Sequence, residues 1–202
     1  ASWLNDLGFE CRILPIANQP GKANLLASFG SGPGGLVMAG HTDTVPCNPE
    51  RWQHDPFALT EANNRWYGLG SCDMKGFFPL IIEAVRSYLN QPFKHPLIIL
   101  ATADEESSMS GARALVAADF SQARHAIIGE PTGMRPIRLH KGIMMERIDI
   151  IGQAGHSSDP GLGHNAMEAM HAVISDLLQL RGSWQKRWSN PLFGVPTPTL
   201  NL

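Results

Sequence analysis

Three short apolar segments that end in acidic or histidine residues constrain the fold of this chain most strongly. They are GGLVMAGH (34–41), PLIILATADEE (96–106) and HAIIGEPT (125–132), and helix-like segments at 77–89 and 111–118 lie between them. Continuous apolar strands that alternate with helices indicate a mostly parallel sheet with helices on both faces. We therefore predict an α/β fold of this kind, preceded by a short helix and by further strands at 9–14 and 23–30.

Polar residues close these segments, and the predicted fold brings them to one edge of the sheet. In open α/β sheets, ligands bind beyond the carboxyl ends of the strands. Six residues from four segments would meet there: His41, Asp43, Asp73, Glu105, Glu106 and Glu130. Imidazole nitrogen and carboxylate oxygen are ligands for zinc and other divalent cations. The sequence therefore predicts a metal site at this edge.

Each of these residues also has an ordinary structural explanation when taken alone. The run ATADEE (101–106) could be a solvated turn, and His41 a turn or core residue. Asp73 could complement a helix dipole, and Glu130 could simply end a strand. Convergence from four segments favours the metal site over these explanations.

The spacing of the residues suggests a division of roles. Asp43 lies two residues after His41, so on an extended segment it could accept the other ring N–H and orient the imidazole. Asp73 stands alone between the other clusters and is the candidate to bridge two metals. Adjacent Glu105 and Glu106 point in different directions, so one can bind metal while the other acts as general base toward the attacking water.

Composition excludes several other classes of function. The chain has 202 residues, 17% of them charged, with a formal net charge of −2, so it shows no basic excess for nucleic acid. No apolar run is long enough to cross a bilayer. The three cysteines lack metal-type spacing and are expected to be reduced thiols. We expect a cytoplasmic protein without nucleic-acid or membrane partners.

The sequence pattern changes near residue 141. IMMERIDIIG (143–152) alternates as a strand with one polar face, and a loop then leads into an amphipathic helix at 166–182. We predict a metal-binding catalytic domain at 1–140 and a smaller α+β lid or dimerisation domain at 141–202. Both are expected to be incomplete, since the chain looks like a fragment of a longer protein.

Five motifs, taken together and in order, resemble a known family. They are GHTDTVP (40–46), GLGSCDMKGF (68–77), ATADEESSMSGAR (101–113), IIGEPT (127–132) and GQAGHSSDPGLGHNAME (152–168). They resemble the zinc-dependent metallohydrolases that include aminoacylases, carboxypeptidases and succinyl-diaminopimelate desuccinylase. The resemblance covers nearly the whole chain and implies a di-zinc exopeptidase-like catalytic domain.

The resemblance implies a set of metal ligands. His41, a bridging Asp73 and Glu130 would hold one metal, while Asp73 and Glu106 would hold part of the other. The cofactors would be two divalent ions, zinc first and cobalt as the alternative. The family completes its second site with a later histidine that this chain does not contain, so we expect the fragment to bind that metal poorly and to be inactive alone.

The resemblance also implies catalytic and binding roles. Glu105 would be the general base, and Asp43 would orient the histidine ligand. His156 matches a lid-domain histidine that reaches a neighbouring subunit's site and stabilises the oxyanion, although a turn in a Gly/Ser/Asp/Pro loop also explains it. Asn165 belongs to the same motif and is expected to bind substrate.

Within the family, the motifs are most similar to the branch that removes the acetyl group from N2-acetylornithine. LVMAGHTDTVP, ILATADEESSMSGAR and the closing VPTPTLNL carry this similarity. It implies a small N-acyl amino acid substrate, a place in arginine biosynthesis and a homodimer formed through the lid domain. Three alternatives stay open: desuccinylation of succinyl-diaminopimelate, dipeptidase or carboxypeptidase activity, and a non-catalytic dimerising relative.

Overall fold

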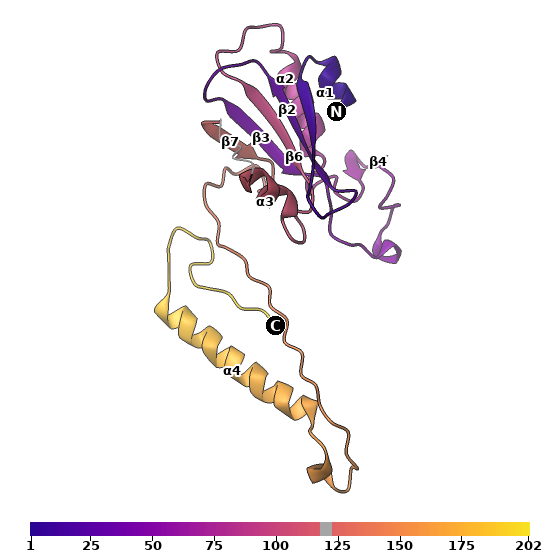
Figure 1. Ribbon diagram of the computed structural model, residues 1–202, viewed down its shortest axis with the longest axis vertical. Coiled ribbons are helices and arrows are strands. Elements are labelled where there is room, and N and C mark those ends of the chain that lie inside the picture. The colour runs from indigo at the N-terminus through magenta and orange to yellow at the C-terminus, as the bar shows by residue number, and fades with distance from the viewer. Residues whose placement is uncertain (118–122) are drawn as a thin grey trace. The chain divides into compact units, whose positions relative to one another are not determined.

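The computed structural model describes residues 1–117 and 123–202, which divide into two units. The first unit, Ala1–Arg135, contains a five-stranded sheet, and the second, Pro136–Leu202, contains one long helix (Figure 1). None of the described helices combines the length and the hydropathy needed to cross a bilayer.

The sheet of the first unit has the strand order β1-β2-β6-β3-β7 (Figure 1). Its strands are β1 (Glu10–Pro15), β2 (Ala23–Phe29), β3 (Leu36–His41), β6 (Leu97–Thr102) and β7 (His125–Ile128). β3 pairs in parallel with β6 and β7, whereas β2 runs antiparallel to β1 and β6. All strands of this sheet except β2 therefore point the same way, which confirms the predicted mostly parallel α/β sheet. β3, β6 and β7 end at a common edge.

Helices cover both faces of the sheet. α2 (Phe77–Arg86) buries Ile81 and Val85, four residues apart, against Ala27 and Ile99 of the strands. α1 (Ser2–Asp6) contributes Leu4 to the same core cluster. Successive strand residues point to opposite faces. Asn24 of β2 lies three residues before Ala27 and therefore points to the other face. Its side-chain N–H donates to the Gly111 carbonyl at 2.9 Å, which places the start of α3 (Ser110–Ala117) on that face. Residue 118, the last of the predicted helix 111–118, lies outside the described residues.

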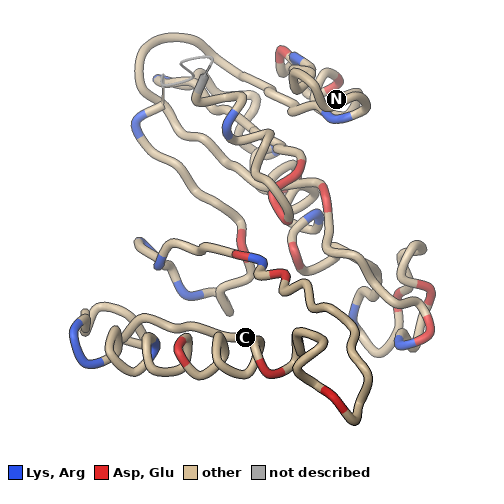
Figure 2. Tube along the Cα trace, turned by 60° about the horizontal axis from the view of Figure 1, so that its bottom comes forward, with Lys and Arg blue, Asp and Glu red and all other residues tan. Residues whose placement is uncertain are grey.

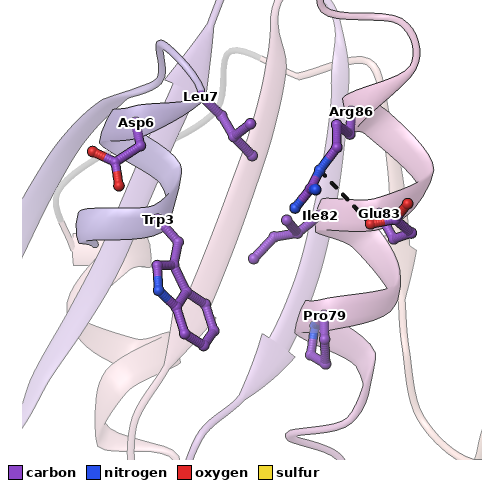
Figure 3. A pocket seen from close by; sticks show the side chains of 7 residues that line it. All are labelled: Trp3, Asp6, Leu7, Pro79, Ile82, Glu83 and Arg86. Carbon is purple, nitrogen blue, oxygen red and sulfur yellow. Dashed lines mark ion pairs between the residues drawn. The ribbon is translucent and has the colours of Figure 1, made fainter.

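A β-hairpin and a groove complete the first unit. The hairpin pairs β4 (Thr60–Ala62) with β5 (Arg65–Tyr67), and Asn63 and Asn64 between them adopt positive φ angles of 53° and 57°. Two left-handed residues are what a tight hairpin turn requires, and asparagine tolerates this conformation. A short 3-10 helix (Pro49–Arg51) precedes the hairpin. A separate groove of about 540 Å³ lies between α1 and α2, and none of the predicted site residues line it (Figure 3).

The second unit contains α4 (Ala166–Arg187), five residues longer than the predicted 166–182. The Asn165 side chain accepts a hydrogen bond from the Met167 N–H at 2.9 Å and so caps the helix. Glu168 lies in the first turn, while Lys186 and Arg187 lie in the last (Figure 2), which complements the helix dipole. Gly182 does not end the helix.

The strand predicted at 143–152 is wrong. Within the second unit, all of which is described, this segment has no regular structure, and Ile143 and Ile151 are 84% and 94% exposed. The alternating pattern fits a half-buried strand, but a strand needs a hydrogen-bonded neighbour. The nearest pairing is an isolated bridge between Gln153 and His164, which closes a loop containing a 3-10 turn (Pro160–Leu162).

Candidate metal centre

His41 is the last residue of β3 and the centre of the predicted site. Its side chain is only 2% exposed. The Nδ1 atom lies 3.0 Å from the backbone carbonyl oxygen of Asp43, and Nε2 lies 3.2 Å from Oδ1 of Asp73. A carbonyl oxygen can only accept, so Nδ1 carries the proton and donates it. In the neutral ring, the lone pair of Nε2 then faces a carboxylate oxygen, and a cation or a proton between the two would make the contact favourable.

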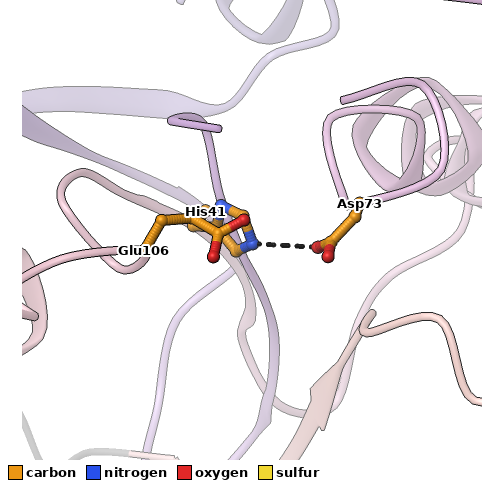
Figure 4. A group of neighbouring side chains, drawn as sticks. All are labelled: His41, Asp73 and Glu106. Carbon is orange, nitrogen blue, oxygen red and sulfur yellow. Dashed lines mark hydrogen bonds and ion pairs between the residues drawn. The ribbon is translucent and has the colours of Figure 1, made fainter. Parts of the chain in front are cut away.

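Three predicted ligands form a group of the size that one metal ion requires. One donor atom each from His41, Asp73 and Glu106 lie within 4.8 Å of one another (Figure 4). Asp73 comes from the loop before α2, and Glu106 from the turn after β6. Residues separated by more than sixty positions therefore meet at the edge that the strand pattern indicated.

Glu105 and Glu130 border the same group. Glu105 Oε2 and Glu130 Oε1 each lie 3.9 Å from Nε2 of His41. Glu130 follows β7, where the Gly129 N–H donates to the carbonyl of Ala39 in β3 at 3.1 Å. Parallel pairing of β3 and β7 thus carries this carboxylate to the histidine.

Burial and crowding raise the pKa of two of the carboxylates around His41. Burial raises the pKa of Glu106 and of Glu130, and the negative charge of Asp73 raises both further. Burial lowers the pKa of His41, but hydrogen bonds to the Asp43 carbonyl and to Asp73, together with the negative charges of Glu105 and Glu130, outweigh it. The pKa of His41 therefore lies above its ordinary value. Repulsion among several acids around one imidazole is what a divalent cation relieves. The donor set therefore fits such a cation.

Asp43 lies at the site, but its carboxylate is used differently from the prediction. The oxygens Oδ1 and Oδ2 accept the backbone N–H groups of Glu105 at 3.2 Å and Glu106 at 3.1 Å. The closest approach of this carboxylate to His41 Nδ1 is 3.6 Å, longer than the contact made by the Asp43 carbonyl. Asp43 thus orients the imidazole through its backbone and holds the paired glutamates through its side chain.

An aromatic cavity of about 280 Å³ adjoins the metal-ligand group. Asp73 and Glu106 form part of its wall, together with Trp52, Trp66 and Tyr67 of the hairpin region. The cavity gives an organic substrate space beside the candidate ligands. It was not predicted, because the tryptophans lie in a segment without strand or helix periodicity.

The two predicted residues of the second unit have local hydrogen bonds. The Ser158 N–H donates to Nδ1 of His156 at 3.2 Å, and the Ser158 hydroxyl lies 2.7 Å from the same atom. Since Nδ1 accepts a hydrogen bond, the neutral ring carries its proton on Nε2 and can donate it. The side chain of Asn165 caps α4 and also donates to Glu168 at 3.3 Å.

Comparison with known proteins shows the family of the chain. The model of peptidase family M20/M25/M40 matches residues 37–185, a range that contains every candidate ligand. The chain belongs to this family. The resemblance seen in the five motifs is thereby confirmed.

One curated relative and two solved structures illustrate the similarity. The chain is 53% identical over its whole length to the acetylornithine deacetylase of Edwardsiella ictaluri, of which it covers 53%. It is similar to human carnosine dipeptidase 1, with a TM-score of 0.56 and 26% identity over 63% of this chain and 30% of that one. A family M20 metallo-carboxypeptidase from Sulfolobus solfataricus shares the fold, with a TM-score of 0.54 and 21% identity over 63% of this chain and 30% of that one. The chain spans about half the length of the curated relative.

Proposed function

We propose that the complete protein hydrolyses N2-acetylornithine to ornithine and acetate, as a step of arginine biosynthesis. The observation that carries this proposal is the 53% identity over the whole chain to a relative named acetylornithine deacetylase. The group of His41, Asp73 and Glu106 beside an open cavity supports a metal-dependent hydrolase.

The proposed metal ligands follow the site geometry and the family resemblance. His41, Asp73 and Glu130 would hold one divalent ion, and Asp73 with Glu106 part of a second, zinc being the first candidate and cobalt the other. Such ions, when bound, polarise a carbonyl and lower the pKa of water. His41 presents Nε2 to this position because Asp43 holds the proton of the opposite nitrogen.

Glu105 is the proposed general base. It takes a proton from the attacking water and returns it to the nitrogen of the leaving amine, so the carboxylate is regenerated in each turnover. Its side chain is 35% exposed and stands outside the three-ligand group, while its backbone N–H is fixed by Asp43. This placement supports separate roles for the two adjacent glutamates, with Glu106 on the metal.

The second unit would supply the remaining functions. His156 would donate its Nε2 proton to the oxyanion, and Asn165 would contact the substrate. We further propose a homodimer formed through the lid domain and a cytoplasmic location.

Initial rates on several substrates test the function. The complete enzyme, loaded with zinc or cobalt, should release acetate from N2-acetylornithine faster than it cleaves succinyl-diaminopimelate or dipeptides. A faster rate on either rival substrate would assign the protein to that activity instead. An absence of hydrolysis together with an absence of bound metal would support the non-catalytic alternative.

A further inference from the structure

The residue immediately before the paired glutamates lies in a polar network that the proposed chemistry does not use. Asp104 has a positive φ of 64°, and its side chain is only 4% exposed. Its carboxylate accepts hydrogen bonds from the ammonium of Lys22 and from three serine hydroxyls, those of Ser107 at 2.7 Å, Ser108, and Ser110 at 2.8 Å.

The backbone of the same turn is held as well. The Asp104 carbonyl accepts the Met109 N–H at 2.7 Å. Asn24 of β2 accepts the Ala103 N–H at 3.1 Å and donates to the Gly111 carbonyl at 2.9 Å. Residues 103–111 are therefore fastened at both ends to β2, the strand that begins directly after Lys22.

Lys22 is placed by its own turn, independently of the metal ligands. The Ile16 N–H donates to the Lys22 carbonyl at 3.0 Å, and the Lys22 N–H donates to the Gln19 carbonyl at 3.1 Å, which closes the connection between β1 and β2. The Lys22 ammonium and the hydroxyls of the three serines converge on the one carboxylate of Asp104. Hydrogen bonds between charged groups of this kind are stronger than those between neutral groups.

Two sets of hydrogen bonds therefore hold the turn that carries the paired glutamates. Asp43 binds the backbone N–H groups of Glu105 and Glu106, while Lys22 and the serines bind Asp104 next to them. A shift of about 1 Å in a catalytic group can lower a rate about a hundredfold.

We propose that Lys22 and Asp104 are positioning residues for the paired glutamates: their ion pair fixes the turn in which Glu106 reaches the metal and Glu105 reaches the water. This inference rests on the proposed hydrolytic function of the same site. Lys22 lies 82 positions before Asp104 in the sequence and would act on the glutamates through that residue.

Replacement of Lys22 tests the proposal in the complete enzyme. Lys22→Met keeps the aliphatic stem and removes the charge, and since the side chain is 42% exposed the protein should still fold. We expect kcat to fall about tenfold with KM nearly unchanged, because a displaced turn affects mainly the transition state. The unfolding temperature should fall as well, since the nearly buried Asp104 carboxylate loses its cation. The affinity for zinc, measured by titrating zinc into the metal-free protein, should also fall. Lys22→Arg should keep kcat and zinc affinity near their wild-type values, and Lys94→Met, at an exposed lysine, is the matched control.

A double-mutant cycle separates positioning from a purely structural role. Asparagine tolerates a positive φ, so Asp104→Asn removes the charge without straining the turn. In that background Lys22→Met should have little further effect on kcat. The proposal is overturned if Lys22→Met behaves like Lys94→Met, or if kcat and the unfolding temperature fall together without rescue by arginine. A wild-type enzyme that releases no acetate would instead refute the proposed function, while the zinc titration would still report on Lys22.

Discussion

The sheet edge of the first unit and the loop of the second unit are built differently. At the sheet edge, β3 pairs in parallel with β6 and β7. The ends of these strands bring carboxylate oxygens of Glu105 and Glu130 to 3.9 Å from Nε2 of His41. In the second unit, the loop that carries His156 is closed by one isolated bridge. Paired strands fix side chains from distant segments relative to one another. In the loop, His156 has local contacts with Ser158, through its ring, and with Asp159, through its carbonyl. The proposed metal ligands are therefore positioned by strand pairing, whereas the proposed oxyanion donor is positioned by local loop contacts.

The largest expected effect is at the sheet edge. Glu105→Gln in the complete enzyme should lower kcat by about 10²–10⁴-fold, because glutamine cannot accept the proton from water. Metal content should remain near that of the wild type, since Glu105 lies outside the three-ligand group. Metal analysis alongside acetate release checks both points. Loss of metal with this substitution would mean that the two glutamates have the opposite roles.

A smaller effect is expected in the second unit. His156→Ala should lower kcat by about 10²–10³-fold with metal retained, as for removal of an oxyanion donor. Steady-state kinetics with metal analysis measures this. His171→Ala, a change of an exposed histidine on α4, is the matched control. An unchanged kcat would leave His156 as a turn residue and would limit the functional region to the first unit.

The smallest effects concern stability and contrast glycines of the two units. A Cβ at Gly129 would overlap the Phe77 ring, so Gly129→Ala should cost about 1–3 kcal/mol of unfolding free energy. A Cβ at Gly142 meets nothing within 4 Å, so Gly142→Ala should change stability by less than about 0.5 kcal/mol. Denaturant unfolding of both variants tests the comparison. Equal destabilisation would contradict the view that the first unit is the more tightly packed around its site.

Much of the sheet edge follows from local patterns in the chain. The apolar runs at 34–41 and 96–106 predict buried parallel strands, and parallel strands bring their ends together. β6 nevertheless ends at Thr102, because Asp104 turns the chain with a positive φ. That conformation depends on Lys22 and Asn24, which lie some eighty residues away, and no spacing rule connects them.

The local patterns also leave other features of the chain undecided. The alternation at 143–152 predicts a strand, yet the second unit places no neighbouring strand beside it. Asp43 contacts the His41 ring as expected from its spacing, but mainly through its carbonyl, because its carboxylate also accepts two backbone N–H groups from a distant turn. Gly182 resembles a helix end, whereas α4 continues to Arg187, shortly before Pro191. For the first two features, a distant contact or its absence decides between options that the local pattern leaves open.

Metal binding to Asp73 variants tests the central claim most directly. Asp73 is the shared ligand of the proposed centre and lies 3.2 Å from His41 Nε2. Zinc should be titrated calorimetrically into the metal-free complete protein, wild type and Asp73→Asn, with Asp55→Asn as a control in the same unit. We predict tight binding by wild type and Asp55→Asn, and loss of that binding in Asp73→Asn. Wild-type zinc affinity in Asp73→Asn would contradict a metal centre at this sheet edge.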